Sequence, residues 1–131
     1  MPDFFISYSR QDADVARSLV KELQEKSILG WLDSADIAGG EAVSSAVRDA
    51  LKRSTVVIVL LSKSALHSQW VQFEIGAAEA LDKKIIPVIL SGDVLEEQLP
   101  DILRHHSWID GRNRPLEEVA RDVKRAAESA H

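Results

Sequence analysis

The sequence predicts an α/β protein of the flavodoxin-like type, with three layers and a five-stranded parallel sheet that has helices on both faces. Two observations predict it. Short apolar runs alternate with segments of helical periodicity along the chain, and one run, Val56–Leu61, is continuous and mostly β-branched. A strand of that kind is buried on both faces, so helices must cover it. Strict alternation of strands and helices favours right-handed crossovers and a parallel sheet.

Each expected element follows from its own pattern of apolar residues. The expected strands are short apolar runs at residues 4–6, 29–32, 56–61, 85–90 and 108–109. The expected helices carry apolar residues three or four positions apart, over residues 15–23, 43–51, 70–81, 96–105 and 116–126. Pro87 indicates an edge strand or an unpaired amide in the fourth strand. Pro115 suits the first turn of the last helix.

The helix over residues 70–81 contains the most informative stretch of the chain. Its expected apolar positions are Trp70, Phe73, Ala77, Ala80 and Leu81. Glu74 stands four residues after Trp70, so the indole and the carboxylate share a face of the helix. This spacing makes Glu74 a candidate catalytic group.

Length and composition indicate one folded domain over residues 1–131. The chain has 16 basic and 21 acidic residues and a net charge of -5, which disfavours nucleic acid as a partner. It has no long apolar run, so no membrane contact is expected. It lacks cysteine, and its first residues do not resemble an export signal, so we expect a cytoplasmic location.

Chemistry is expected where the strands end, because sites in this architecture form at the carboxyl edge of the sheet. The segment Ser7–Asp12 contains no glycine, which argues against a dinucleotide site of the Rossmann type. No P-loop motif occurs, and Ser7, Ser62 and Asp110 stand where a phosphoacceptor domain needs acidic residues and a lysine. No histidine spacing suits a metal site, so none is expected.

Four motifs in this order resemble the Toll/interleukin-1 receptor (TIR) domain family over essentially the whole chain. They are an opening Asp-Phe-Phe-Ile-Ser-Tyr-Ser, a Gly-Trp-Leu-Asp strand exit followed by residues 36–40, the exit of the third strand over residues 59–66, and Trp-Val-Gln-Phe-Glu at residues 70–74. The compact form and the Trp-Val-x-x-Glu wording resemble the bacterial, NAD-cleaving type. That resemblance implies an NAD+ glycohydrolase acting in antiphage defence, with NAD+ as substrate and no cofactor.

The resemblance also assigns roles to particular residues. It implies that Glu74 is catalytic and that Trp70 stacks on a flat ring of the substrate. The residues it carries to the substrate-binding surface are Ser9, Arg10, Asp33, Ile37 and Trp70. Many cleaving relatives have two basic residues at the first strand exit, and here Ser9 replaces one of them. We expect Glu74 to face an open cleft that is large enough for a nucleotide.

Each of these residues also has a structural interpretation. Glu74 can be an ordinary solvated carboxylate, and Trp70 can be a packing residue. Arg10 can simply pair with Asp12 or Asp14. Asp33 can satisfy loop amides.

The resemblance implies a partner as well as a substrate, namely other TIR domains that associate with this one. Head-to-tail contacts of that kind can propagate as filaments. The alternative function is a non-catalytic TIR interaction module in signalling or host mimicry. The sequence leaves open whether the product of cleavage is ADP-ribose or a cyclic isomer.

Overall fold

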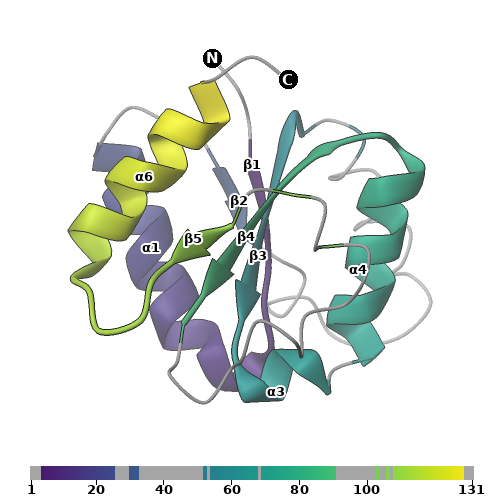
Figure 1. The fold of residues 1–131 in the computed structure, drawn as a ribbon, viewed down its shortest axis with the longest axis horizontal. Helices are drawn as coiled ribbons and strands as arrows, with labels where there is room; N and C mark the ends of the chain where they lie inside the picture. Colours follow the sequence, from purple (N-terminus) through teal and green to yellow (C-terminus); the bar gives the residue numbers. More distant parts are fainter. Residues whose placement is uncertain are drawn as a thin grey trace.

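The computed structural model describes residues 4–25, 30–32, 52, 54–67, 69–90, 103, 106 and 108–128. Within them the strands pair in the order β2-β1-β3-β4-β5, and all neighbours are parallel (Figure 1). The strands are β1 (Phe4–Ser7), β2 (Gly30–Leu32), β3 (Val56–Leu61), β4 (Lys84–Ile89) and β5 (Ile109–Asp110). This order is that of flavodoxin-like proteins, which confirms the predicted fold class.

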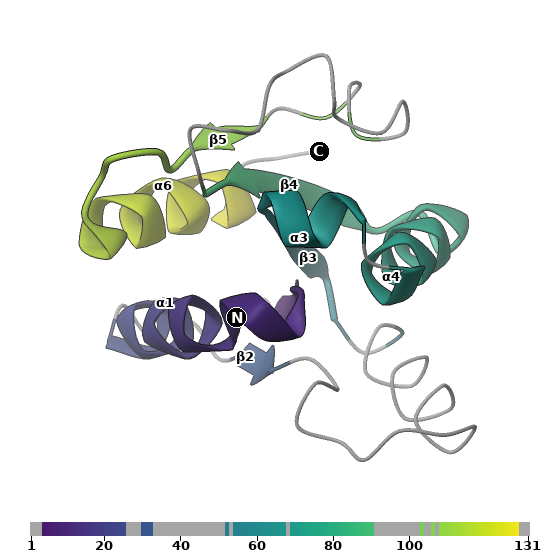
Figure 2. The same ribbon diagram turned by 90° about the horizontal axis from the view of Figure 1, so that it is seen from below.

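Helices lie on both faces of this sheet. They are α1 (Ala13–Glu25), α3 (Lys63–Leu66), α4 (Gln69–Ala80) and α6 (Leu116–Glu128), and a 3₁₀ turn, η1 (Arg10–Asp12), precedes α1. Figure 2 shows α1 and α6 on one side of the sheet and α4 on the other. Two hydrophobic clusters result, one between the sheet and α4 and one between the sheet, α1 and α6.

Strand β3 is the centre of the core, as its composition predicts. All six of its residues are buried, and alternate residues enter the two clusters. Strand β1 alternates in the same way, with Phe5 in the α4 cluster and Phe4 and Ile6 in the other. This alternation directs Ser7, two residues after Phe5, toward α4.

Pro87 lies in an interior strand, at a position where a missing amide costs no hydrogen bond. The Leu90 amide donates to the Leu61 carbonyl of β3 at 2.9 Å, so alternate amides along β4 face β3 and the Pro87 nitrogen faces the other neighbour. That neighbour, β5, first pairs with β4 at Val88. The prediction of an unpaired amide is therefore met without β4 being an edge.

The predicted apolar face of α4 is wrong at Phe73, Ala80 and Leu81, which are exposed; Ala77 packs against the core, and the side chain of Trp70 lies outside the described residues. Phe73 is 42% exposed and Leu81 is 36% exposed. The helix instead buries one face at the spacing i, i+3, i+4 and i+7, made of Val71, Glu74, Ile75 and Ala78. The helix is turned so that a carboxylate occupies the middle of its buried face, a placement that hydrophobic periodicity by itself does not favour.

The other predicted elements either agree with the structure within two residues at each end or lie outside the described part of the chain. Strand β5 begins at Ile109, one residue later than predicted, and Pro115 directly precedes α6. The helix predicted over residues 43–51 lies outside the described residues, as does the one over 96–105 apart from the buried Leu103. No helix in the described part of the chain is long and apolar enough to cross a membrane.

Candidate active site

The exit of β1 forms a compact turn that leads directly into α1. Ser9 caps the η1 turn, since its hydroxyl accepts from the Gln11 amide at 3.4 Å and its carbonyl accepts from the Asp12 amide at 2.8 Å. Ser9 is almost fully buried, while Arg10 is exposed. The turn therefore places Arg10, an exposed cationic residue, at the carboxyl end of β1.

Two side-chain hydrogen bonds connect this turn to the exit of β3. The Ser62 hydroxyl donates to Asp12 Oδ2 at 2.5 Å, and the Ser64 hydroxyl donates to Gln11 Oε1 at 2.6 Å. The Ser62 oxygen also accepts from the Ala65 amide at 3.1 Å and so caps α3. The exits of these adjacent strands are thereby held together as one unit.

Glu74 of α4 contacts the last residue of β1, next to the turn that Ser9 caps. The Ser7 hydroxyl donates to Glu74 Oε1 at 2.6 Å, and both side chains are fully buried. Both stand at positions where the local pattern calls for an apolar residue, because Ser7 follows Phe5 on one face of β1 and Glu74 lies between Val71 and Ile75 on α4. Two polar residues therefore face each other inside an otherwise apolar cluster.

Burying such a pair lowers the free energy of unfolding unless other interactions compensate for it. Taking a carboxylate out of water costs several kcal/mol, and hydrogen bonds only partly offset that cost. Buried ionisable groups with a specific partner are enriched at functional sites. The burial of Glu74 argues against its interpretation as a solvated surface carboxylate.

The expectation of an open cleft at Glu74 is not met in the single chain. The side chain of Glu74 is 0% exposed, because α4 packs directly on β1 and β3 around it. A substrate can reach the carboxylate only after neighbouring groups move.

The other predicted site residues are only partly described. Ser9 and Arg10 lie at the β1 exit, close in sequence to Ser7. The backbone of Trp70 is in the first turn of α4, but its side chain lies outside the described part of the chain, as do Asp33 and Ile37. Of the predicted set, the structure thus describes the side chains of Glu74, Ser9 and Arg10.

Arg10 is not used in the ion pairs that the sequence allows. Asp12 accepts from Ser62 instead, and Asp14 lies 3.8 Å from Arg17. Among the described residues no ion pair of Arg10 is seen, so its charge is available to an anionic ligand.

Ser7 is the site residue that the sequence prediction missed. Its signal is the alternation of β1, in which Phe5 and Ser7 share a face, so that a hydroxyl stands where a third apolar residue would fit the pattern. A buried serine at a strand end indicates a polar partner on the covering helix. Here that partner is Glu74.

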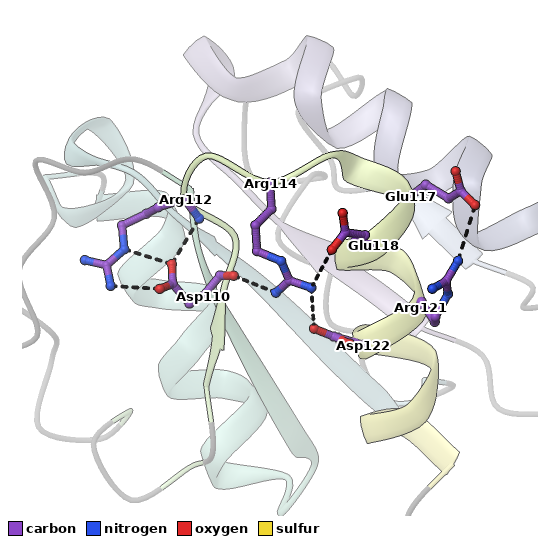
Figure 3. A network of polar contacts seen from close by, with 7 residues as sticks. All are labelled: Asp110, Arg112, Arg114, Glu117, Glu118, Arg121 and Asp122. Atoms are coloured by element: carbon purple, nitrogen blue, oxygen red, sulfur yellow. Dashed lines mark hydrogen bonds and ion pairs between the residues drawn. The ribbon is translucent and has the colours of Figure 1, made fainter.

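A second polar cluster lies between the edge strand β5 and helix α6 (Figure 3). Arg114 donates to the Asp110 carbonyl at 2.8 Å and to Asp122 Oδ2 at 2.7 Å. A cleft of about 460 Å³ beside it is lined by Trp108, Ile109, Asp110, Asp122, Arg125 and Ala126. Because α6 and α4 cover opposite faces of the sheet, this cleft is separate from Glu74.

Asp110 provides a prediction about acid stability. A two-pronged contact with Arg112, at 2.8 and 3.0 Å, lowers the pKa of Asp110 from 3.8 to about 2. A depressed folded-state pKa contributes stability above the unfolded value, so this contribution is lost as the pH falls from about 4 to about 2. In a carbon-detected NMR titration we expect the Asp110 midpoint near pH 2 in the wild type and at a higher pH in Arg112→Ala, still below 3.8 because the amide of residue 112 and Arg114 continue to lower the pKa. A wild-type midpoint near 3.8 would contradict the contact.

Comparison with known proteins places the chain in a family. The family model described as "TIR domain" matches residues 4–125. The metazoan TIR-STING receptor from C. gigas, solved with 2',3'-cGAMP, superposes with a TM-score of 0.78 at 27% identity, over 96% of this chain and 39% of that one.

Curated bacterial relatives match over shorter stretches. The NAD(+) hydrolase TcpC of Escherichia coli O6:H1 is 34% identical over 89 residues, which are 64% of this chain and 29% of the relative. The 2' cyclic ADP-D-ribose synthase AbTIR of Acinetobacter baumannii is 28% identical over 102 residues, 72% of this chain and 38% of the relative. This chain therefore spans less than two fifths of either relative. The match over residues 4–125, together with the sheet order, makes this chain a member of the TIR domain family.

Proposed function

We propose that this TIR domain is an NAD+ glycohydrolase and that Glu74 is the group that breaks the bond between nicotinamide and ribose. The observation that carries the proposal is the buried carboxylate of Glu74, hydrogen-bonded to Ser7 at the carboxyl end of β1. The names of the relatives from Escherichia coli and Acinetobacter baumannii, a NAD(+) hydrolase and a cyclic ADP-D-ribose synthase, support the same chemistry.

One carboxylate is sufficient for this reaction. Ordinary glycosidases need a second carboxyl group to protonate the leaving oxygen. Nicotinamide departs as a neutral molecule from a pyridinium nitrogen that is already cationic, so the remaining demand is to stabilise the positive charge on the ribose. Glu74 opposes that charge and accepts hydrogen bonds from the ribose hydroxyls, and its effect is larger where water is excluded.

The neighbouring residues bind the rest of the dinucleotide in this proposal. Arg10 is exposed at the β1 exit and contacts the phosphate oxygens, with Ser9 beside it. Trp70, one helical turn before Glu74, stacks on a flat ring of the substrate. Asp33 and Ile37 complete the pocket from the exit of the second strand.

Self-association is the second part of the proposal. Because Glu74 is enclosed in the single chain, neighbouring groups must move before NAD+ can enter. We propose that contacts with other TIR domains favour the open state, so that activity rises with protein concentration. A role as an effector in bacterial antiphage defence fits an activity that is silent until the domains assemble.

The proposal is tested by following nicotinamide release from NAD+ at increasing protein concentration, with light scattering recorded in parallel. We expect release per chain to rise as assemblies form. Chromatography of the other product separates ADP-ribose, formed by water, from a cyclic isomer, formed by attack of the substrate's own adenine or ribose. No release at any concentration, with assemblies present, would contradict the proposal.

Arg10→Ala is expected to raise KM for NAD+ by about 10-fold and to change kcat little, because a charge-assisted contact to phosphate is lost away from the bond that breaks. Initial rates over a range of NAD+ concentrations measure both constants. The matched control is Arg17→Ala, since Arg17 is exposed on α1 and lies near Asp14. An unchanged KM in Arg10→Ala would contradict the assigned contact.

A non-catalytic interaction module is the second candidate. The enclosure of Glu74 in the single chain favours it, because an enclosed carboxylate cannot meet a substrate unless its neighbours move. Assemblies that form normally but never release nicotinamide would support this function.

A further inference from the structure

Ser7 has a place in the fold that allows little movement. It is the last residue of β1 and pairs with Val59 of the central strand. Its side chain is fully buried on the α4 face of the sheet, and its hydroxyl donates to Glu74 Oε1 at 2.6 Å. The donor is therefore fixed by the sheet itself.

Glu74 is also held by a regular element. It lies in the first half of the 12-residue helix α4, which packs on β1, β3 and β4. Ser7 belongs to the sheet, because it is part of β1 and pairs with β3. We therefore expect Ser7 to stay in place when other groups around the Glu74 carboxylate move to admit a substrate.

We infer that Ser7 is the positioning residue for Glu74, holding one carboxylate oxygen so that the group meets the ribose in a single orientation. The inference rests on the proposed function and adds to it a residue that does not touch the reacting atoms. A hydrogen bond to one oxygen restricts rotation about the last bond of the glutamate side chain, which is otherwise broad. Small errors in the placement of a reacting group cost large factors in rate.

The inference predicts that replacing Ser7 changes kcat but not KM. Ser7→Ala is expected to lower kcat for nicotinamide release by about 10-fold, the size of one lost hydrogen bond to a charged group. KM should change little, because Ser7 does not contact the substrate. Ser7→Thr keeps the hydroxyl and should recover most of the lost kcat. The control is Ser54→Ala, which removes another buried serine, before β3 at the opposite end of the sheet.

A double variant shows whether Ser7 acts through Glu74. In the Glu74→Ala background, Ser7→Ala should cause no further loss of the residual rate, because the group being positioned is already absent. A further loss of about 10-fold there would mean that Ser7 acts independently, and would overturn the inference. This comparison does not depend on how well the larger threonine fits the site.

The outcomes distinguish this inference from the proposed function. If the wild type releases nicotinamide and Ser7→Ala has the wild-type kcat, the inference fails and the proposed function stands. If the wild type releases none under assembling conditions, the proposed function fails and the positioning role fails with it. A loss of kcat in Ser7→Ala that is equal to the loss in Ser54→Ala would reduce Ser7 to a packing residue.

Discussion

Glu74→Gln is expected to lower nicotinamide release by about 100-fold or more, the effect typical of removing one preorganised electrostatic group. Glutamine has almost the same shape as glutamate, and its carbonyl oxygen can still accept the hydrogen bond from Ser7. What it lacks is the negative charge that opposes the cationic ribose. Release is measured by chromatography at a protein concentration where the wild type is active, and circular dichroism checks that the fold is retained.

Glu79→Gln is the matched control for this variant. It is the same substitution on the same helix, but Glu79 is exposed and pairs with His106 at 3.1 Å. Its rate should equal that of the wild type. Wild-type release by Glu74→Gln, or an equal loss in Glu79→Gln, would remove the catalytic role of Glu74.

The double variant Ser7→Ala/Glu74→Leu is expected to be inactive but more stable than the wild type. It replaces a buried polar pair with apolar side chains inside a cluster that already contains Phe5, Val71 and Ile75. Replacing buried charged groups by apolar residues of similar volume often raises the free energy of unfolding, by about 1 to 4 kcal/mol. Urea unfolding followed by circular dichroism measures this change.

The single variants show the cost of breaking the pair. Ser7→Ala alone removes a hydrogen bond from a buried carboxylate and should lower the free energy of unfolding by about 1 to 3 kcal/mol. Glu74→Leu alone leaves the Ser7 hydroxyl without this acceptor, so it should stabilise less than the double variant. A double variant that is less stable than the wild type would mean that the pair serves the fold, which contradicts its interpretation as a site kept for function.

The central strands could be predicted because their signal does not depend on context. Val56–Leu61 is apolar throughout, so it suits burial on both faces whatever covers it. The face of α4 could not be predicted in this way. Apolar residues fit a helical stripe through Phe73 and Leu81 as well as one through Val71, Ile75 and Ala78, and the second stripe requires Glu74 to be buried.

The sequence predicted only part of the candidate site, because the burial of a side chain depends on how the elements pack against one another. Glu74 was identified through its resemblance to a motif, and its enclosure in the single chain was not expected. Ser7 was missed because a serine at a strand end is usually a turn residue. Only the distance between its hydroxyl and Glu74 indicates a role in the site. The roles assigned to Glu74, Ser9 and Arg10 stay predictions, and so do the parts of the prediction that fall on residues 33–50 and on the side chain of Trp70, which lie outside the described residues.

The most direct test of the account is a structure of the assembled protein with a non-cleavable NAD+ analogue bound. The account predicts that the nicotinamide-bearing ribose lies against the carboxylate of Glu74, with its hydroxyls within hydrogen-bond distance and the Ser7 hydroxyl still bound to the same carboxylate. An analogue bound elsewhere, such as in the cleft between β5 and α6, with Glu74 still enclosed, would contradict it.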